Sequence, residues 1–406
     1  MELDKIRQVQ IDPLDTSSRE QCFVVSYLDR HFEVSAAAER FIRTAREAQT
    51  PEDLRTQYSE ITGRSYSAEQ IAEIWQCCVG PILAAETKPP KKPLWIKKDL
   101  FSQETVAGLS TRLKRLFVPG IAIPLSVATL GTNVWFLATL RGGKIPIEGG
   151  FYVLLGVLVF FLVSSSFHEL GHASACQYYG ISHGAVGFGL YMNFPVFYTD
   201  VSQVWKLRRR QRIVVNLAGT YFQLLLMLPL LCIYFQTYSP ILRFVLITAN
   251  LNFLITLNPV FKFDGYWVMA DLLGVPNLRS RVMEGFVYLK KKICRQPIKH
   301  KPFLWTMKPA EKCVMLVYSL LMNLMFVYYL GYVMPRFIGQ FISTFPDLAK
   351  QLIIAISQGQ TPSFGLLQAI VVQLIFFGLT CFALFRLIYS LVKRYRKKHQ
   401  VNVAEG

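Results

Sequence analysis

The stretch Phe167-His168-Glu169-Leu170-Gly171-His172 decides the fold, and it lies near the end of an apolar run that begins at residue 151. On a helix, His168 and His172 lie on one face, about one turn apart. This spacing suits two ligands of one zinc ion, and Glu169 can reach a water on that ion as a general base. Because a charged side chain at membrane depth costs about 2.5–3.5 kcal/mol on insertion scales, the stretch predicts a functional metal site inside a membrane helix.

The composition predicts a membrane protein with several spanning helices. Of the 406 residues, 52% are hydrophobic and 17% are charged, which is too apolar for an ordinary soluble protein. The formal net charge is +18, but Lys and Arg cluster beside apolar runs, where they set topology and contact anionic membrane lipid. No motif that reads nucleic acid accompanies this charge, so we expect no nucleic acid partner. The eight cysteines form no Cys-x-x-Cys pair, which argues against a disulfide framework and a zinc ribbon.

Six segments approach or exceed the roughly 20 apolar residues that a spanning helix needs: residues 117–140, 151–179, 213–236, 241–260, 313–334 and 364–391. Lys and Arg gather before the first segment and after the second, fourth and sixth, whereas the alternate loops carry few. The positive-inside rule therefore predicts that both termini are cytoplasmic. The second segment then runs inward, with His168 and His172 toward its cytoplasmic end. We expect a mostly α-helical polytopic domain at residues 117–392 and a basic tail at residues 393–406.

The fourth segment supplies a candidate third ligand, because it ends in Asn258-Pro-Val-Phe-Lys-Phe-Asp264-Gly-Tyr266. A catalytic zinc site takes three protein ligands and leaves one position for water. Pro259 and Gly265 bracket a helix break that can turn the Asp264 carboxylate inward. Asn258 offers an amide that can hydrogen-bond a substrate carbonyl or orient a ligand.

Other polar residues are weaker candidates. Cys176 lies one turn beyond His172, and His183 follows the end of the helix, so either can approach the metal; packing is the ordinary alternative for the cysteine. Asp200 can orient a ligand from outside the metal shell. Asp271 is expected to pair with the Arg208–Arg212 cluster or to cap a helix.

Residues 184–200 are rich in glycine and aromatic side chains. They are too irregular for a helix and too apolar for a solvated loop, which favours a membrane-associated β-hairpin near the metal, since non-helical backbone at membrane depth needs protein around it. Such a hairpin offers edge amides to an extended substrate. A surface loop remains the alternative.

The sequence of residues 1–86 predicts a small α+β, winged-helix-like domain. Residues 22–28 and 32–34 have the composition of a β-hairpin. Three helix starts follow, at a capping Ser35, at Thr50-Pro51 and at the capping box Ser67-Ala-Glu-Gln70. A basic linker, residues 87–116, then leads to the membrane.

The order of these elements resembles the PqqD-like fold, the peptide-binding module called the RiPP recognition element. The resemblance implies that this domain holds the leader of a precursor peptide as a strand added to its hairpin edge. A generic winged helix, or a regulatory domain with no peptide ligand, is the alternative.

The two membrane motifs together resemble the site-2 protease class of intramembrane zinc metalloproteases, peptidase family M50. The resemblance implies one catalytic Zn²⁺ held by His168, His172 and Asp264, with Glu169 as the catalytic acid/base and Asn258 positioning substrate. Tyr266 departs from the second glycine of many members, and no PDZ-like insertion is evident. Residues 164–277 resemble the branch of peptide zinc metalloproteases found with bacterial peptide-maturation and export systems.

This resemblance implies a protease of the bacterial cytoplasmic (inner) membrane. It would mature a small, ribosomally made and modified precursor peptide, with an exporter or other maturation enzymes as partners. One alternative is cleavage of a membrane-bound regulator. Another is a non-catalytic peptide-export or immunity component, although such a component has no need for a complete set of polar site residues inside the membrane.

Overall fold

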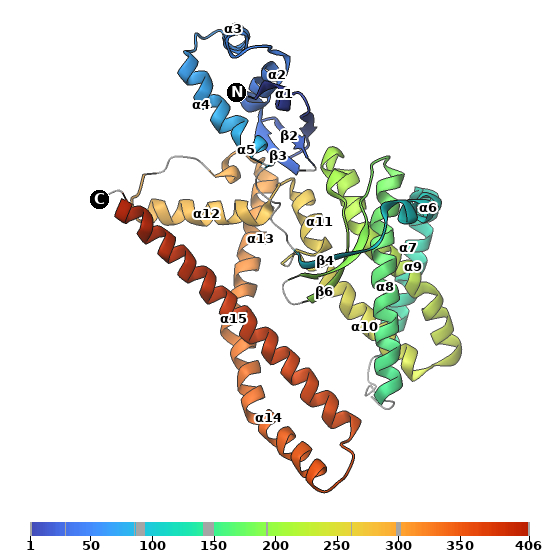
Figure 1. Cartoon of the computed structure of the whole chain (residues 1–406). Coiled ribbons are helices and arrows are strands. Elements are labelled where there is room, and N and C mark those ends of the chain that lie inside the picture. The colour runs from blue at the N-terminus through green and yellow to red at the C-terminus, as the bar shows by residue number, and fades with distance from the viewer. Residues whose placement is uncertain are drawn as a thin grey trace. The chain divides into compact units, whose positions relative to one another are not determined.

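The structure, a computed structural model, describes residues 2–28, 30–84, 86, 94–140, 150–191, 194–260, 262–297 and 302–404. In these residues the chain is mostly helical and carries two antiparallel sheets of three strands each (Figure 1). It divides into two compact units, Met1–Ile145 with Gly156–Val317, and Pro146–Leu155 with Tyr318–Gly406. Both sheets and the three predicted metal ligands belong to the first unit.

The first sheet lies near the start of the chain, after the short helix α1 (Leu3–Ile6). Its strands β1 (Gln10–Leu14), β2 (Cys22–Tyr27) and β3 (Arg30–Ser35) are ordered β1-β2-β3, so β3 is an edge strand. The predicted hairpin is present as β2 and β3. Strand β1 was not predicted, because Pro13 is unfavourable in a strand, although proline is tolerated at a sheet edge.

Helices α2 (Ala36–Glu47), α3 (Pro51–Thr62) and α4 (Ala68–Cys78) follow, and the short α5 (Gly80–Leu83) ends this region. All three longer helices begin where the sequence predicts. Their N-terminal backbone N–H groups are capped by the side chains of Ser35, Thr50 and Ser67. Sheet and helices share one apolar core, which includes Val25, Phe41, Ile42, Leu54, Ile71 and Trp75.

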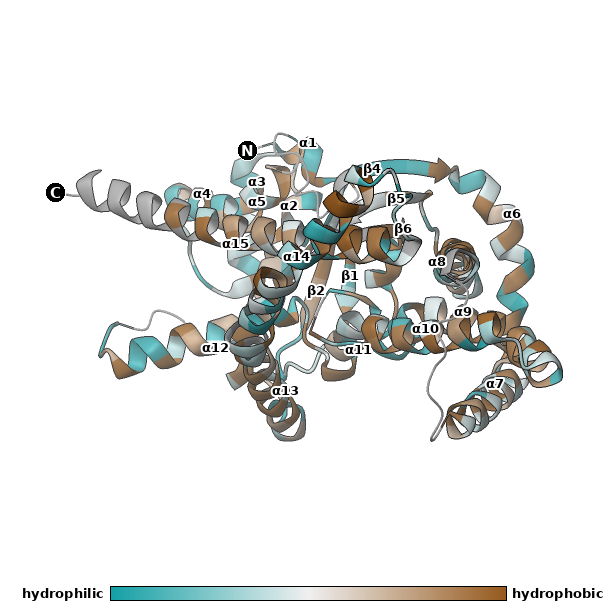
Figure 2. Cartoon of the chain, turned by 90° about the horizontal axis from the view of Figure 1, so that it is seen from below, coloured by the Kyte–Doolittle hydropathy of each residue, from teal (hydrophilic) through white to brown (hydrophobic). Residues whose placement is uncertain are grey.

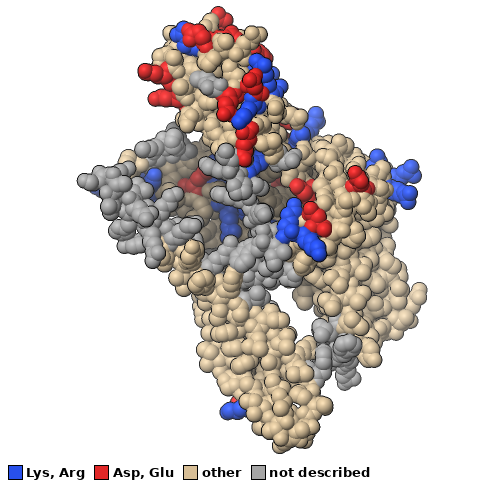
Figure 3. All heavy atoms as spheres, viewed as in Figure 1, with Lys and Arg blue, Asp and Glu red and all other residues tan. Residues whose placement is uncertain are grey.

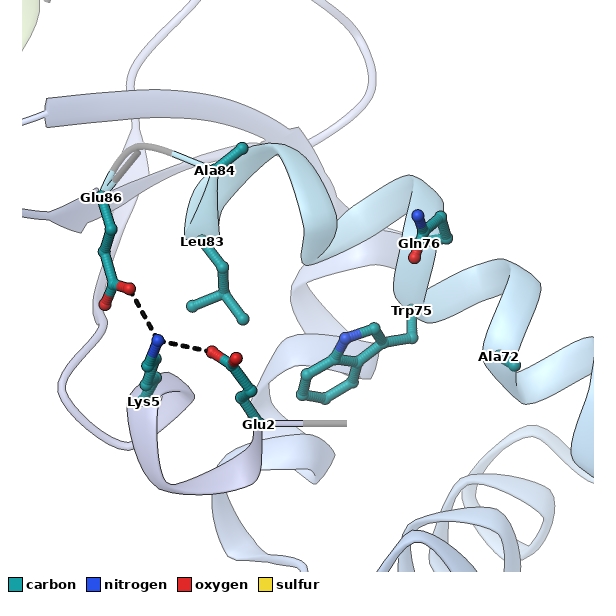
Figure 4. A pocket seen from close by; sticks show the side chains of 8 residues that line it. All are labelled: Glu2, Lys5, Ala72, Trp75, Gln76, Leu83, Ala84 and Glu86. Carbon is teal, nitrogen blue, oxygen red and sulfur yellow. Dashed lines mark hydrogen bonds and ion pairs between the residues drawn. The ribbon is translucent and has the colours of Figure 1, made fainter. Parts of the chain in front are cut away.

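A cavity of about 500 Å³ opens in this region beside α1, α4 and α5 (Figure 4). The indole of Trp75 forms part of its apolar wall. On the other side, the Lys5 ammonium bridges the carboxylates of Glu2 and Glu86, at 2.7 Å from each. The Tyr27 hydroxyl also donates to Glu86, and this hydrogen bond raises the pKa of Tyr27. Glu86 is therefore tied to α1 and to strand β2.

The predicted linker needs a correction. Residues 87–93 lie outside the described residues, but the following segment forms strand β4 (Leu94–Phe101), helix α6 (Gln103–Leu113) and a 3-10 turn, η1 (Lys114–Phe117). The strand was missed because its pairing partner is about 90 residues further along the chain. β4 pairs with β5 (Val186–Tyr191), which pairs in turn with β6 (Phe194–Thr199), so the predicted hairpin is the β5–β6 part of a larger sheet.

Four described helical stretches are long and apolar enough to cross a membrane. They lie in α7 (Pro119–Thr139), α8 (Gly150–Tyr178), α9 (Arg209–Thr237) and α15 (Phe364–Ala404). Apolar residues dominate these helices in Figure 2. The apolar α10 (Pro240–Thr256) has 17 residues and is shorter than this class. Four candidates, rather than the six predicted spans, therefore meet both criteria among the described residues.

Shorter elements complete the first unit. They are the 3-10 turns η2 (Ser202–Lys206) and η3 (Phe303–Trp305), α11 (Asp264–Leu273), α12 (Leu278–Ile293) and the start of α13 (Pro309–Tyr328). On the face in view in Figure 3, charged side chains gather over the N-terminal sheet and helices and around β4.

The second unit consists mainly of long helices. A π-helical segment, η4 (Tyr329–Val333), joins α13 to α14 (Met334–Ser357). α14 packs against α15 through stacked rings of Phe341 and Phe377, 4.0 Å apart, and through a hydrogen bond between Thr344 and Gln373. α15 continues to Ala404, so the predicted basic tail at residues 393–406 is helical as far as it is described.

We expect Phe41→Ala to destabilise the N-terminal region by about 3–5 kcal/mol, because the fully buried ring leaves a cavity. Hydrogen exchange of the α2–α4 amides measures this local unfolding in the full chain. Ile61→Ala is the control on α3, since Ile61 is 57% exposed and should change the exchange little. Equal effects of the two substitutions would contradict the core described above.

Candidate metal centre

His168, His172 and Asp264 converge on one point. Nε2 of His168 lies 3.0 Å from Oδ2 of Asp264, Nε2 of His172 lies 3.3 Å from the same oxygen, and the two nitrogens are 3.1 Å apart. A tetrahedral zinc ion with bonds of about 2.0–2.1 Å holds its ligand atoms about 3.3 Å from one another. The separations of all three pairs are therefore close to those of a zinc ligand set.

The hydrogen bonding at His172 and Asp264 also fits a metal. Nδ1 of His172 lies 2.8 Å from the carbonyl oxygen of Val215 on α9, and because a carbonyl oxygen only accepts, this nitrogen carries the proton. With its proton on Nδ1, a neutral His172 would present the Nε2 lone pair to the centre, the arrangement usual for a metal-binding histidine. Oδ2 of Asp264 is buried with no hydrogen-bond partner among the described residues, which a cation would satisfy.

Three glycines allow the helices to approach this closely. A Cβ atom at Gly219 of α9 would lie 2.5 Å from Nε2 of His168, so only a glycine leaves room for the ring. A Cβ at Gly171 would collide with the Ala218 carbonyl, and one at Gly265 would collide with the Leu257 carbonyl. The roles of Gly171 and Gly219 were not predicted, although small residues are the usual signal of close helix packing in membranes.

Glu169 follows the first histidine on α8, and its side chain is buried. Its backbone carbonyl accepts a hydrogen bond of 3.2 Å from the Thr199 hydroxyl. Thr199 ends β6, which is an edge strand of the second sheet. The end of β6 is therefore held against the backbone of Glu169.

Asn258 lies at the break between α10 and α11. Its Oδ1 accepts from the Val260 N–H at 2.8 Å, an Asx turn that shapes the chain around Pro259. This contact gives Asn258 a role in turning the chain toward Asp264. Its predicted role in positioning substrate remains a prediction.

The three weaker candidates are not grouped with His168, His172 and Asp264. Cys176 is buried in an apolar cluster between α8 and α9. His183 uses both ring nitrogens elsewhere, Nδ1 with the Gly184 carbonyl at 2.9 Å and Nε2 with the Ser110 hydroxyl at 3.3 Å. Asp200 is exposed, and its carboxylate accepts from the backbone N–H of Ser202, where η2 begins.

The expected pairing of Asp271 with the basic cluster is confirmed. Arg212 of α9 forms a buried ion pair with Asp271 of α11, with 2.5 Å between Nε and Oδ1. Asn216 donates to the other carboxylate oxygen at 2.7 Å. Helix α11 is therefore held to α9 through Asp271, whereas Asp264 at its other end lies against His168 and His172 of α8.

Comparison with known proteins finds a partial similarity. The chain is similar to a Bacillus subtilis (strain 168) protein named "Putative peptide zinc metalloprotease protein YydH". The two are 29% identical over 147 residues, which make up 35% of this chain and 58% of the length of that protein. No family model matches the chain, and no solved structure matches it.

We expect Gly219→Ala to lower zinc affinity at least about 10-fold, because the added methyl group displaces the His168 ring. Alanine is the better helix former, so a loss would not come from helix propensity. Gly131→Ala on α7 is the control, since nothing lies within 4 Å of its Cβ position. Zinc titration against a chelating dye measures the affinity; unchanged binding in Gly219→Ala would contradict His168 as a ligand.

Proposed function

We propose that this chain is a zinc peptidase of the bacterial cytoplasmic (inner) membrane that cleaves a small, ribosomally made and modified precursor peptide. The observation that carries the proposal is the convergence of His168, His172 and Asp264 beside a buried Glu169 in an apolar helix. The partial similarity to a protein named as a peptide zinc metalloprotease supports it. Cleavage would remove the leader or otherwise mature the peptide for export.

The reaction is peptide-bond hydrolysis. A single zinc ion bound at the three ligands would activate a water molecule and polarise the scissile carbonyl. Glu169 accepts a proton from the attacking water and delivers it to the leaving amine. The Val215 carbonyl fixes the tautomer of His172, and the absence of a side chain at Gly219 leaves space for the His168 ring.

The substrate lies extended at the centre, because a helical peptide keeps its carbonyl groups in internal hydrogen bonds. Edge strand β6 can hold it by strand addition, since its unpaired backbone groups offer donors and acceptors. The hydrogen bond from Thr199 to the backbone carbonyl of Glu169 joins the end of this strand to the residue that carries the catalytic carboxylate. Asn258 would help to position the substrate.

The N-terminal region, residues 1–86, acts as a PqqD-like recognition element. Its β3 is an edge strand, which suits the addition of a leader peptide as a further strand. Holding the leader there raises the concentration of the scissile segment at the metal centre. An exporter and other maturation enzymes would be the partners, and no nucleic acid is involved.

In the proposed topology, six spans cross the membrane and both termini lie in the cytoplasm. The four candidate helices support a membrane location. This topology places the metal-bearing end of α8 and the recognition element on the same side.

Two other functions are distinguished by experiment. A protease that cleaves a membrane-bound regulator would retain the Glu169 chemistry but would not bind a leader peptide. A non-catalytic export or immunity component would show no dependence on Glu169 at all.

Glu169→Gln should lower the cleavage rate by about 10²–10⁴-fold while zinc stays bound, because the amide cannot accept the proton. Mass spectrometry of a precursor incubated with the full chain in lipid nanodiscs measures cleavage, and metal analysis measures zinc. Glu104→Gln is the control, since Glu104 lies in the exposed first turn of α6. Cleavage at the original rate by Glu169→Gln would overturn the mechanism.

The inactive Glu169→Gln chain should bind a complete precursor about 10²-fold more tightly than the same peptide without its leader, because two sites then act together. Competition against a fluorescent precursor measures both affinities. A scrambled leader of equal composition controls for charge. Equal affinities would favour cleavage of a membrane-bound regulator.

A further inference from the structure

Arg212 and Asp271 form a buried ion pair that the proposed chemistry does not use. Arg212 is 2% exposed and Asp271 is 7% exposed. The other polar atoms of the two side chains are hydrogen-bonded as well. Asn216 donates to the second carboxylate oxygen of Asp271, and Nη1 of Arg212 donates to the Leu207 carbonyl. Removing one partner of such a pair is costly, because a buried charge then stays uncompensated.

The pair lies on the helix that carries the candidate ligand Asp264. Asp264 and Asp271 are seven residues apart on α11, which is two helical turns, so both face the same side. That side faces α9, where Asn216 holds Asp271 and the neighbouring Val215 carbonyl holds His172. Rotation or sliding of α11 would therefore break the ion pair and displace Asp264 together.

The N-terminal region reaches the same pair. Nη2 of Arg212 donates to the backbone carbonyl of Asp15 at 3.0 Å, and the Arg209 backbone N–H donates to the Asp15 carboxylate at 3.2 Å. The backbone N–H and the hydroxyl of the buried Ser17 both donate to the carbonyl of Gly274, which caps the end of α11. Residues 15–19 belong to the connection between β1 and β2.

Arg209 of α9 makes a second set of contacts, with α11 and α13. Its guanidinium donates to the carbonyls of Asp271 and Leu272 at the end of α11 and pairs with Glu311 at the start of α13. These contacts thus consist of backbone carbonyls and charged groups that are satisfied by the two arginines. Hydrogen bonds in such a network depend on the relative positions of their donors and acceptors, so the loss of one bond weakens the neighbouring bonds.

We propose that the Arg212–Asp271 pair is a positioning device through which the docked N-terminal region holds Asp264 in the metal centre. The inference rests on the proposed function, in which Asp264 binds zinc. Under this proposal the N-terminal region does more than hold the leader peptide, because its docking determines the affinity of the centre for zinc. By linkage, zinc binding must favour docking to the same extent.

Ser17→Asp tests the proposal from the N-terminal side, because it places a carboxylate at the fully buried position facing the Gly274 carbonyl. In the full chain, we expect faster hydrogen exchange at residues 264–273 and a zinc affinity about 10–100-fold lower. The visible spectrum of the Co²⁺-loaded chain should lose intensity as the tetrahedral site opens. Ser65→Asp, the same change at an exposed residue of the same region, should alter none of these.

Asp271→Asn tests it from the other side and keeps the volume of the side chain. It should speed exchange at residues 15–19 and lower zinc affinity to a similar extent, and the double variant should lose less than the two single losses combined. The proposal is overturned if loosening of either segment leaves the exchange of the other unchanged. Hydrogen exchange can be measured without metal. If the wild-type chain binds no zinc, the proposed function fails, whereas the exchange measurements still show whether residues 15–19 and 264–273 are coupled.

Discussion

The candidate centre depends on the close packing of helix α9 against α8. At Gly219 the backbone of α9 leaves room for the His168 ring, and at Gly171 the backbone of α8 accepts the Ala218 carbonyl. The same approach brings the Val215 carbonyl to Nδ1 of His172. Because lipid provides no hydrophobic force between helices, this packing rests on van der Waals contact and on the few polar bonds that close approach permits.

Two groups of polar residues in the first unit are satisfied in different ways. Arg212, Asp271 and Asn216 satisfy one another within the protein. Asp264 leaves a buried oxygen without a hydrogen-bond partner among the described residues, beside two imidazole nitrogens. Buried polar groups that satisfy one another are expected where their role is structural. A buried polar group without a hydrogen-bond partner is expected where a ligand completes the set. The proposed metal and the proposed positioning device follow from this difference.

The sequence predicted those parts of the fold that local chemistry determines. The spacing of His168 and His172, the break before Asp264 and the capping residues Ser35, Thr50 and Ser67 depend on neighbours within a few positions. β4 could not be predicted because its partner β5 is remote in sequence. The role of Gly219 depends on which helix faces it, and the docking of Ser17 on Gly274 depends on a contact 257 residues away. The ligand roles of the predicted residues remain predictions, although the structure brings the three together.

The second sheet favours one place for an extended peptide under the proposed function. β5 is central, so the free edges are β6 and the outer side of β4. Adjacent strands are about 4.8 Å apart, which puts the outer edge of β4 about 10 Å beyond β6. Among the strands described here, β6 is the one hydrogen-bonded, through Thr199, to the backbone of Glu169. The chain thus covers the far side of its own hairpin with β4, whereas β6, the strand that is joined to Glu169, has no second strand paired with it among the described residues.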